Sequence, residues 1–181
     1  MKKAFTMLEL IMVIVIIGIL AAVIIPRTGS NNTAEAAVKL ISDIRYTQHL
    51  AMIDDKYGDN VGIPWYQKLW QIRFNGNTYS IRSVDTAGNE FFAVDPMENN
   101  GRMQNIDLNN KFGVTLTPDA NCSDGVNNFI AFDHIGRPMV GDINGTSPYT
   151  NLMTNNCTIT ISGDGPNVIL TIRPETGYVS N

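Results

Sequence analysis

The residues near the start of the chain that could do chemistry are one acid and two bases, set around a long apolar run. Lys2 and Lys3 precede the run, Glu9 lies inside it, and every residue from Leu10 to Ile25 is apolar or glycine. A carboxylate inside an apolar segment of membrane length is costly, so it usually marks a function and has a partner. These residue types indicate charge pairing in an apolar environment and imply no reaction chemistry.

Two cysteines offer a second possible chemistry. Cys122 and Cys157 lie far apart in the sequence, and together with His49 and His134 they match no zinc-binding spacing. In an oxidising compartment such a pair would form a disulfide. In a cytosolic protein the two would be unrelated small hydrophobic residues.

Motifs for catalysis, cofactors and nucleic acid are absent from the sequence. It contains no Walker, dinucleotide-binding or G-x-S-x-G pattern, so we expect no enzymatic activity and no cofactor. The segment from Asp119 to Gly125 is similar to an acidic calcium loop, but Ile130 stands where a bidentate glutamate is required. It fails as an EF-hand, we assign no metal ligand, and an irregular calcium loop remains the alternative. The net charge of −4 argues against a nucleic-acid partner.

The apolar run itself has several interpretations. Counted from Phe5 it is long enough for a membrane-spanning helix, and Lys2 and Lys3 place its N-terminus in the cytoplasm. A cleaved secretory signal peptide and a plain membrane anchor are alternatives, but neither needs Glu9. A buried core helix is a third, although the run is apolar around its whole circumference, which fits lipid better than one packed face.

The order of these residues resembles the N-terminal motif of type IV pilins and pseudopilins, the class III signal. The match covers the sequence FTMLELI from Phe5 to Ile11 and the sequence GILAA that leads to Pro26. The resemblance implies that a prepilin peptidase cuts between Ala4 and Phe5, that Phe5 is then N-methylated, and that Glu9 becomes the fifth mature residue. The family usually has glycine before the cut, where this chain has Ala4.

Cleavage would create a cationic amine at Phe5, which Glu9 of a neighbouring subunit could neutralise. Such a pair would set the axial stagger of helices in a filament, as a buried polar pair sets register in a coiled coil. The resemblance thus implies a structural subunit: a minor pseudopilin of a type II secretion system, or a minor pilin of a type IV pilus. Its partners would be other pilins or pseudopilins, the prepilin peptidase and the bacterial inner membrane.

The implied localisation is a single-pass inner-membrane protein with its C-terminal domain in the periplasm, or outside the cell once in a filament. Because that side of the membrane is oxidising, we expect a disulfide between Cys122 and Cys157.

Periodicity along the rest of the chain predicts an α+β fold. A long hydrophobic N-terminal helix continues into an amphipathic helix that packs on antiparallel β-sheet, as in pilins. The predicted parts are a leader (1–4), a transmembrane and filament-core helix (5–26), an amphipathic helix (27–57) and a β-rich periplasmic domain (58–181). The helical pattern from Thr33 to Asp55 has a buried stripe of Ala37, Ile41, Ile44, Ala51 and Met52, with Lys39, Asp43 and Arg45 outside it.

Strand patterns follow the amphipathic helix. The turn residues Asn75-Gly76 predict a hairpin between a strand at 69–74 and a strand at 78–84. Further short strands are predicted at 91–94, 112–116, 129–133, 158–162 and 168–172.

The C-terminal half carries a second resemblance. The segment from Phe129 to Pro138 is similar to a hairpin of the H-type type II secretion pseudopilins and of FimT-like minor pilins, and residues 158–162, 168–172 and 176–179 are similar to that family's closing strands. A tip-located binding module for DNA or a secreted substrate is therefore the alternative function. The last residues carry only Arg173 and Glu175 as charges, which would attract phosphate weakly.

Three aromatic residues cluster after Pro64 and are predicted to form a core edge in preference to a ligand platform: Trp65, Tyr66 and Trp70. His134 lies in a turn pattern, where we expect an exposed or turn-stabilising role.

Overall fold

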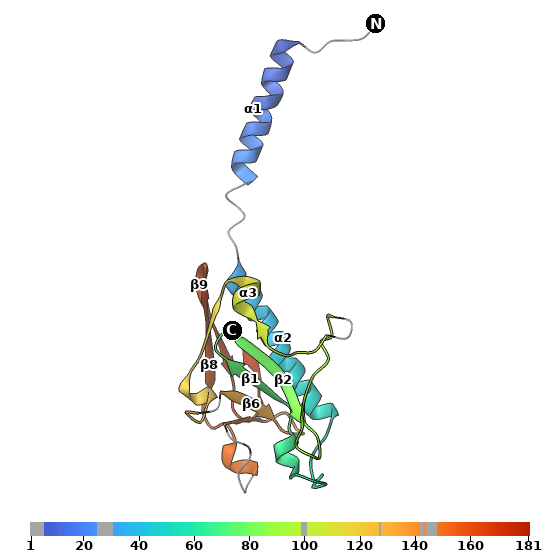
Figure 1. The fold of residues 1–181 in the computed structure, drawn as a ribbon. Coiled ribbons are helices and arrows are strands. Elements are labelled where there is room, and N and C mark those ends of the chain that lie inside the picture. Colours follow the sequence, from blue (N-terminus) through green and yellow to red (C-terminus); the bar gives the residue numbers. More distant parts are fainter. Residues whose placement is uncertain (1–5, 25–30, 99–100, 127, 142, 144–147) are drawn as a thin grey trace. The chain divides into compact units, whose positions relative to one another are not determined.

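The computed structural model describes residues 6–24, 31–98, 101–126, 128–141, 143 and 148–181. The chain divides into two compact units, residues 1–31 and 32–181. The first unit contains helix α1 (Met7–Ile24), and the second contains all other elements (Figure 1). Residues 25–30, which the sequence assigns to the end of one helix and the start of the next, lie outside the described part.

The second unit combines helices with two antiparallel sheets. Its helical elements are α2 (Asn32–Ile53), η2 (Trp65–Lys68), α3 (Leu108–Phe112), η3 (Ala120–Cys122) and η4 (Pro148–Asn151). Its strands are β1 (Gln71–Asn75), β2 (Thr78–Val84), β3 (Glu90–Phe92), β4 (Ile106–Asp107), β5 (Thr115–Pro118), β6 (Phe129–Phe132), β7 (Pro138–Val140), β8 (Cys157–Gly163), β9 (Gly165–Ile172) and β10 (Val179–Ser180).

One sheet has the strand order β3-β2-β1-β6-β7, with β4 also paired to β2, and the other has the order β10-β9-β8-β5. Helix α2 contacts strands of both sheets, among them β1 and β6 of the first and β8 and β9 of the second. The predicted α+β fold, with an amphipathic helix packed on antiparallel sheet, is therefore confirmed.

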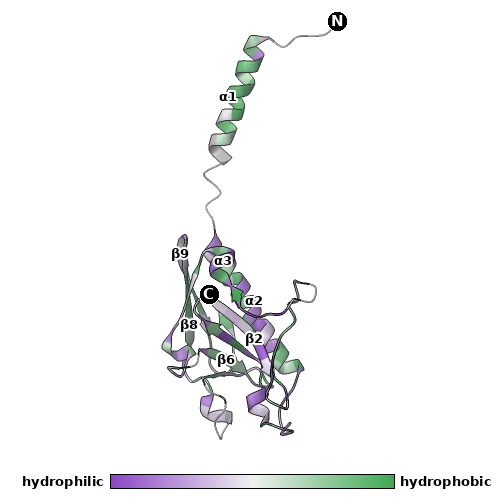
Figure 2. Cartoon of the chain, in the orientation of Figure 1, coloured by the Kyte–Doolittle hydropathy of each residue, from purple (hydrophilic) through white to green (hydrophobic). Residues whose placement is uncertain are grey.

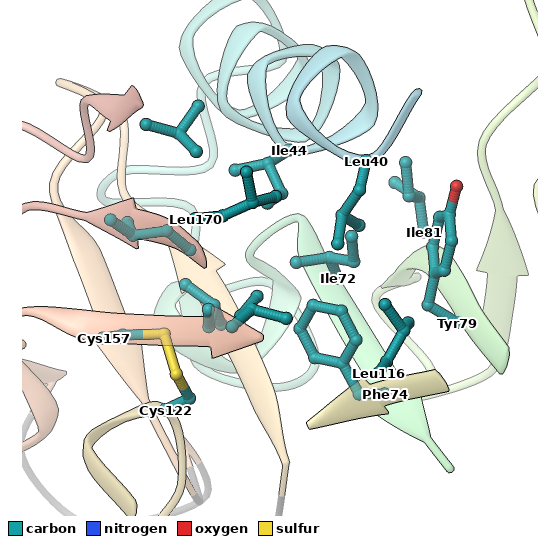
Figure 3. Packing of buried hydrophobic residues seen from close by; sticks show 14 of the residues in the cluster. Leu40, Ile44, Ile72, Phe74, Tyr79, Ile81, Leu116, Cys122, Cys157 and Leu170 are labelled. Carbon is teal, nitrogen blue, oxygen red and sulfur yellow. A yellow bond between two sulfur atoms is a disulfide. The ribbon is translucent and has the colours of Figure 1, made fainter. Parts of the chain in front are cut away.

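The main core forms where α2 meets the two sheets. Leu40 and Ile44 of α2 are completely buried and lie against side chains of both sheets, such as Ile72 and Leu170 (Figure 3). Of the predicted stripe, Ala37, Ile44 and Ala51 are buried, Ile41 is half-buried and Met52 is exposed. The buried stripe of α2 is therefore centred on Leu40, the residue next to the predicted stripe residue Ile41.

The prediction for Asp43 of α2 is wrong. The sequence places Asp43 outside the buried stripe, but only 4% of the residue is exposed. It is buried because polar groups surround it: the hydroxyl of Tyr79 and the ammonium of Lys39 both donate to its carboxylate. A buried carboxylate needs such partners, and sequence periodicity alone does not identify them.

The hairpin at Asn75-Gly76 is confirmed, with β1 and β2 paired in register around it. The predicted strand at 112–116 is partly wrong, because Phe112 ends the one-turn helix α3 and β5 begins only at Thr115. The carboxylate of Asp107 caps α3 by accepting from the backbone N–H of Asn110, and Gly113 ends the helix in the left-handed conformation.

Candidate functional site

The surface of α1 is the first candidate site, because it combines a single charge with an otherwise apolar helix. Glu9 is the one charged residue of the helix, and the described apolar side chains are exposed on every face, from Val13 at 48% to Met7 at 84%. Figure 2 shows α1 as hydrophobic along most of its length. A helix that is apolar all round is normally covered by lipid or by other protein. In the described residues, no helix combines the length and the apolarity needed to cross a membrane.

Glu9 occupies a defined place in the first turn of α1. The hydroxyl oxygen of Thr6 accepts a hydrogen bond from the backbone N–H of Glu9 at 3.3 Å, and the carbonyl of Thr6 accepts from the N–H groups of Glu9 and Leu10. Thr6 and Glu9 therefore have the spacing of a capping box, a signal present in the sequence but missed there. The negative charge of Glu9 also lies favourably near the positive end of the helix dipole.

The predicted cleavage and methylation site, Ala4 and Phe5, lies outside the described residues. Of the residues predicted to act in filament assembly, the structure therefore places only Glu9.

The predicted disulfide between Cys122 and Cys157 is present, with 4.8 Å between the two Cα atoms (Figure 3). Cys122 ends η3, Cys157 begins β8, and both are completely buried within the main core. The bond joins the η3 loop to the four-stranded sheet. Backbone pairing reinforces this junction, because the N–H of Asp119 donates to the carbonyl of Thr158 at 2.8 Å.

The loop considered for calcium is occupied by internal hydrogen bonds. The carboxylate of Asp119 accepts from the backbone N–H of Asn121 at 3.1 Å and from the hydroxyl of Thr158 at 2.8 Å. Among the described residues, the one group of potential metal ligands close enough together is Asp119 with Cys122 and Cys157. Since both sulfurs are in the disulfide, they carry no thiolate for a metal, and Asp119 acts as the cap of η3.

The segment from Phe129 to Pro138 forms β6, a tight turn and the start of β7. The buried carboxylate of Asp133 accepts from the backbone N–H groups of Ile135 (3.1 Å) and Arg137 (2.7 Å) and from the guanidinium of Arg137 (2.7 Å). Gln48 of α2 then donates its side-chain amide to the carbonyl of Gly136 at 2.8 Å. The turn is thus fixed to α2, and Asp133 and Arg137 pair with each other within it, whereas the buried Nδ1 of His134 has no hydrogen-bond partner among the described residues.

The aromatic residues after Pro64 behave as predicted for a core edge. Trp65 and Trp70 are buried in two different clusters, and the indole N–H of Trp70 donates to Asp54 at 2.8 Å. His134 is half-buried, with its ring 4.3 Å from that of Tyr57.

Two arginines that sequence reasoning missed come together on β1 and β2. Arg73 and Arg82 share the face of the six-stranded sheet opposite the main core, next to Glu90 of β3. The alternation of both strands across the Asn75-Gly76 hairpin was a signal that could have found them.

Comparisons with known proteins give no relative for this chain: no protein-family model, no curated protein and no solved structure matches it.

Proposed function

We propose that this chain is a structural subunit of a type IV pilin-like filament, either a minor pseudopilin of a type II secretion system or a minor pilin. In this proposal the chain is cleaved after Ala4, N-methylated at Phe5, and held in the inner membrane by its N-terminal helix until it enters the filament. The domain that contains the disulfide lies in the periplasm.

The observation that carries the proposal is the single carboxylate of Glu9 on a helix that is otherwise apolar on every described face. A cap alone does not require a charge, because a glutamine also fits a capping box. An acid whose helix is enclosed by lipid or by other helices needs a cation, and the N-terminal amine of a neighbouring subunit supplies one.

The run from Leu10 to Ile25, in which every residue is apolar or glycine, is the sequence feature that supports membrane insertion before assembly. On assembly, the N-terminal helix would exchange its contacts with lipid for contacts with the N-terminal helices of other subunits. The packing of α2 on antiparallel sheet supports the same proposal, since a globular domain fixed to one helix is the architecture expected of a pilin.

Two substitutions separate the charge of Glu9 from its cap. Glu9→Gln keeps a side chain compatible with the capping box but removes the charge. Thr6→Ala removes the cap and keeps the charge. The full-length chain carrying either change replaces the wild-type copy in its own cells, and the amount in sheared filaments is measured relative to the amount in membranes.

We expect Glu9→Gln to remain in the membrane while its incorporation into filaments falls about tenfold or more. The variant leaves the N-terminal amine of the neighbouring subunit buried without a partner, and an unpaired buried charge costs about 3–5 kcal/mol. Thr6→Ala should incorporate almost normally. Normal incorporation of Glu9→Gln, or an equal loss with both variants, would show that the charge of Glu9 does not drive assembly.

A further inference from the structure

The outer face of the six-stranded sheet carries two like charges on neighbouring strands. Arg82 of β2 lies opposite Gln71 of β1, and Arg73 lies two positions further along β1, opposite Ser80. The two positions are diagonal neighbours on one face of the sheet, and an anion between two such like charges would reduce their repulsion. The strand alternation that turns Ile72 and Ile81 into the core turns both arginines outward.

Protein groups within the described residues satisfy these arginines incompletely. Arg82 forms an ion pair with Glu90, but its buried Nε has no hydrogen-bond partner, although only 11% of the side chain is exposed. Burial, and then the nearby charge of Arg73, lower the pKa of the Arg82 guanidinium. Arg73 has its guanidinium 5.8 Å from the centre of the Phe129 ring, and no carboxylate in the described part of the chain pairs with it.

Two depressions of about 490 and 340 Å³ meet at these residues, since Arg73, Arg82 and Glu90 line both of them. Glu90 is the only acidic residue among their described lining residues. The remaining described lining residues include neutral hydrogen-bonding side chains, such as Asn75, Ser80, Gln104 and Asn105, and apolar or aromatic ones, such as Phe92 and Phe129. We call the two depressions together the arginine groove.

We propose that the arginine groove binds an extended peptide segment that contains one isolated acidic residue, with the carboxylate of that residue held between Arg73 and Arg82. The planar guanidinium presents paired N–H donors that match the two oxygens of a carboxylate. The neutral amides and hydroxyls along the walls can pair with the backbone on either side of the acidic residue. This site lies in residues 32–181 and does not depend on the proposed assembly of α1.

Charge favours a peptide over a nucleic acid as the occupant. Binding to a polyphosphate draws its affinity from many lysine and arginine contacts along the backbone. The groove offers two arginines and one competing glutamate, on a chain with a net charge of −4. A segment with an isolated carboxylate meets the two arginines and brings little additional negative charge.

Glu90 would compete with the carboxylate of the peptide for Arg82. Its carboxylate pairs with Arg82 and is half exposed, so an incoming carboxylate can displace it. Glu90→Gln should therefore strengthen binding, whereas Arg73→Gln and Arg82→Gln should weaken it. Arg73 is exposed, so its replacement leaves the fold intact even where loss of the more buried Arg82 perturbs the sheet.

The test is an NMR titration of the full-length chain in a non-ionic detergent. The probe is a blocked seven-residue peptide with one central glutamate among serines and glycines. A matched peptide with central glutamine and a single-stranded oligothymidylate are titrated in parallel. Arg173→Gln, an exposed arginine outside the groove, controls for the change in net charge.

We expect the glutamate peptide to shift the signals of β1 and β2, and the glutamine peptide to leave them unchanged. Arg73→Gln should lower the affinity about tenfold, and Glu90→Gln should raise it about two- to fivefold. Arg173→Gln should have little effect. Equal binding of the two peptides, binding that is unaffected by Arg73→Gln, or tighter binding of the oligonucleotide through the same arginines would overturn the proposal.

Discussion

Asp43 is a carboxylate on α2 whose environment opposes its charge. Burial raises the pKa of this carboxyl above its ordinary value of 3.8, although hydrogen bonds from Lys39 and Tyr79 and the charge of Lys39 act in the other direction. The charge of Asp95 adds to the rise. Burial, followed by the charge of Asp43, likewise raises the pKa of the Tyr79 phenol. Asp43 and Tyr79 thus share a hydrogen bond in the interior, where loss of a proton from either group is unfavourable.

Replacing Asp43 with asparagine should change how stability depends on pH. Between pH 3.8 and the raised pKa, the folded protein binds more protons at Asp43 than the unfolded chain does. The contribution of Asp43 to the free energy of unfolding therefore falls as pH rises. The unfolding free energy of Asp43→Asn minus that of wild type should therefore increase between about pH 4 and about pH 7. The increase is about 1.4 kcal/mol for each pH unit that separates 3.8 from the raised pKa.

Urea unfolding at both pH values measures this difference, and Asp85→Asn is the control of opposite sign. Asp85 is exposed, and hydrogen bonds, first that from the Asn89 side chain, lower the pKa of its carboxyl. For Asp85→Asn the difference should thus decrease as pH rises toward 3.8, and it should stay nearly constant between pH 4 and pH 7. If the unfolding free energy of Asp43→Asn minus that of wild type stays constant or decreases from pH 4 to pH 7, burial does not raise the pKa of Asp43.

At the scale of elements, the disulfide between η3 and β8 should provide a large share of the stability of the domain. A covalent loop with a sequence separation of 35 restricts the unfolded chain. Replacing Cys122 and Cys157 together with alanine should therefore lower the unfolding free energy by about 3–4 kcal/mol. Urea unfolding of the double variant, compared with wild type before and after reduction, measures the effect.

Reduced wild type should unfold at nearly the same urea concentration as the double variant. Thiol labelling of the denatured, unreduced chain is the independent check. Two reactive thiols would show that the bond is absent.

The β6–β7 turn should tolerate a side chain at Gly136 less well than the β1–β2 turn tolerates one at Gly76. Both glycines have positive φ, +85° and +59°, but a Cβ at Gly136 would lie 2.9 Å from the amide nitrogen of Gln48, whereas nothing lies within 4 Å at Gly76. Gly76→Ala should cost about 1–2 kcal/mol in backbone strain. Gly136→Ala should cost about 2–4 kcal/mol, because Gln48 would also lose its bonds to Gly136 and Thr176.

Thermal or urea unfolding of the two alanine variants gives the comparison. Equal destabilisation would mean that the contact between Gln48 and the turn contributes little.

Local signals predicted the elements that depend on neighbours in sequence. The amphipathic pattern predicted α2, and Asn75-Gly76 predicted the β1–β2 hairpin. The short strand β7 was missed because it has three residues and begins with Pro138, which removes a backbone donor. The division into two sheets could not be predicted, since strands β1 and β6 pair across a long stretch of intervening sequence.

The candidate sites divide in the same way. Glu9 stood out because a charge within an apolar run is visible in the sequence itself. The partners of Asp43 and the unsatisfied Nε of Arg82 depend on contacts between strands and helix, and on burial that no single segment determines. The proposed cation for Glu9 belongs to another subunit, so no fold of one chain contains it.

At the scale of the whole molecule, the two units have contrasting surfaces. The helix α1 is apolar on every described face, whereas residues 32–181 form a unit with its own core, a disulfide and a groove with two arginines. The first surface suits burial in lipid or among helices, and the second suits a domain in water. In the proposed filament, assembly would depend on α1, and the proposed peptide recognition would depend on the domain.

The measurement that tests the filament-subunit proposal most directly is the identity of the mature N-terminus. The full-length chain is produced in bacterial membranes together with a prepilin peptidase, extracted, and examined by intact-mass and N-terminal analysis. We predict a chain that begins at N-methylated Phe5, because Lys2, Lys3 and Glu9 flank this position as the class III signal requires. A chain that keeps its leader, or one that begins near Ala22 after cleavage by a secretory signal peptidase, would contradict the proposal.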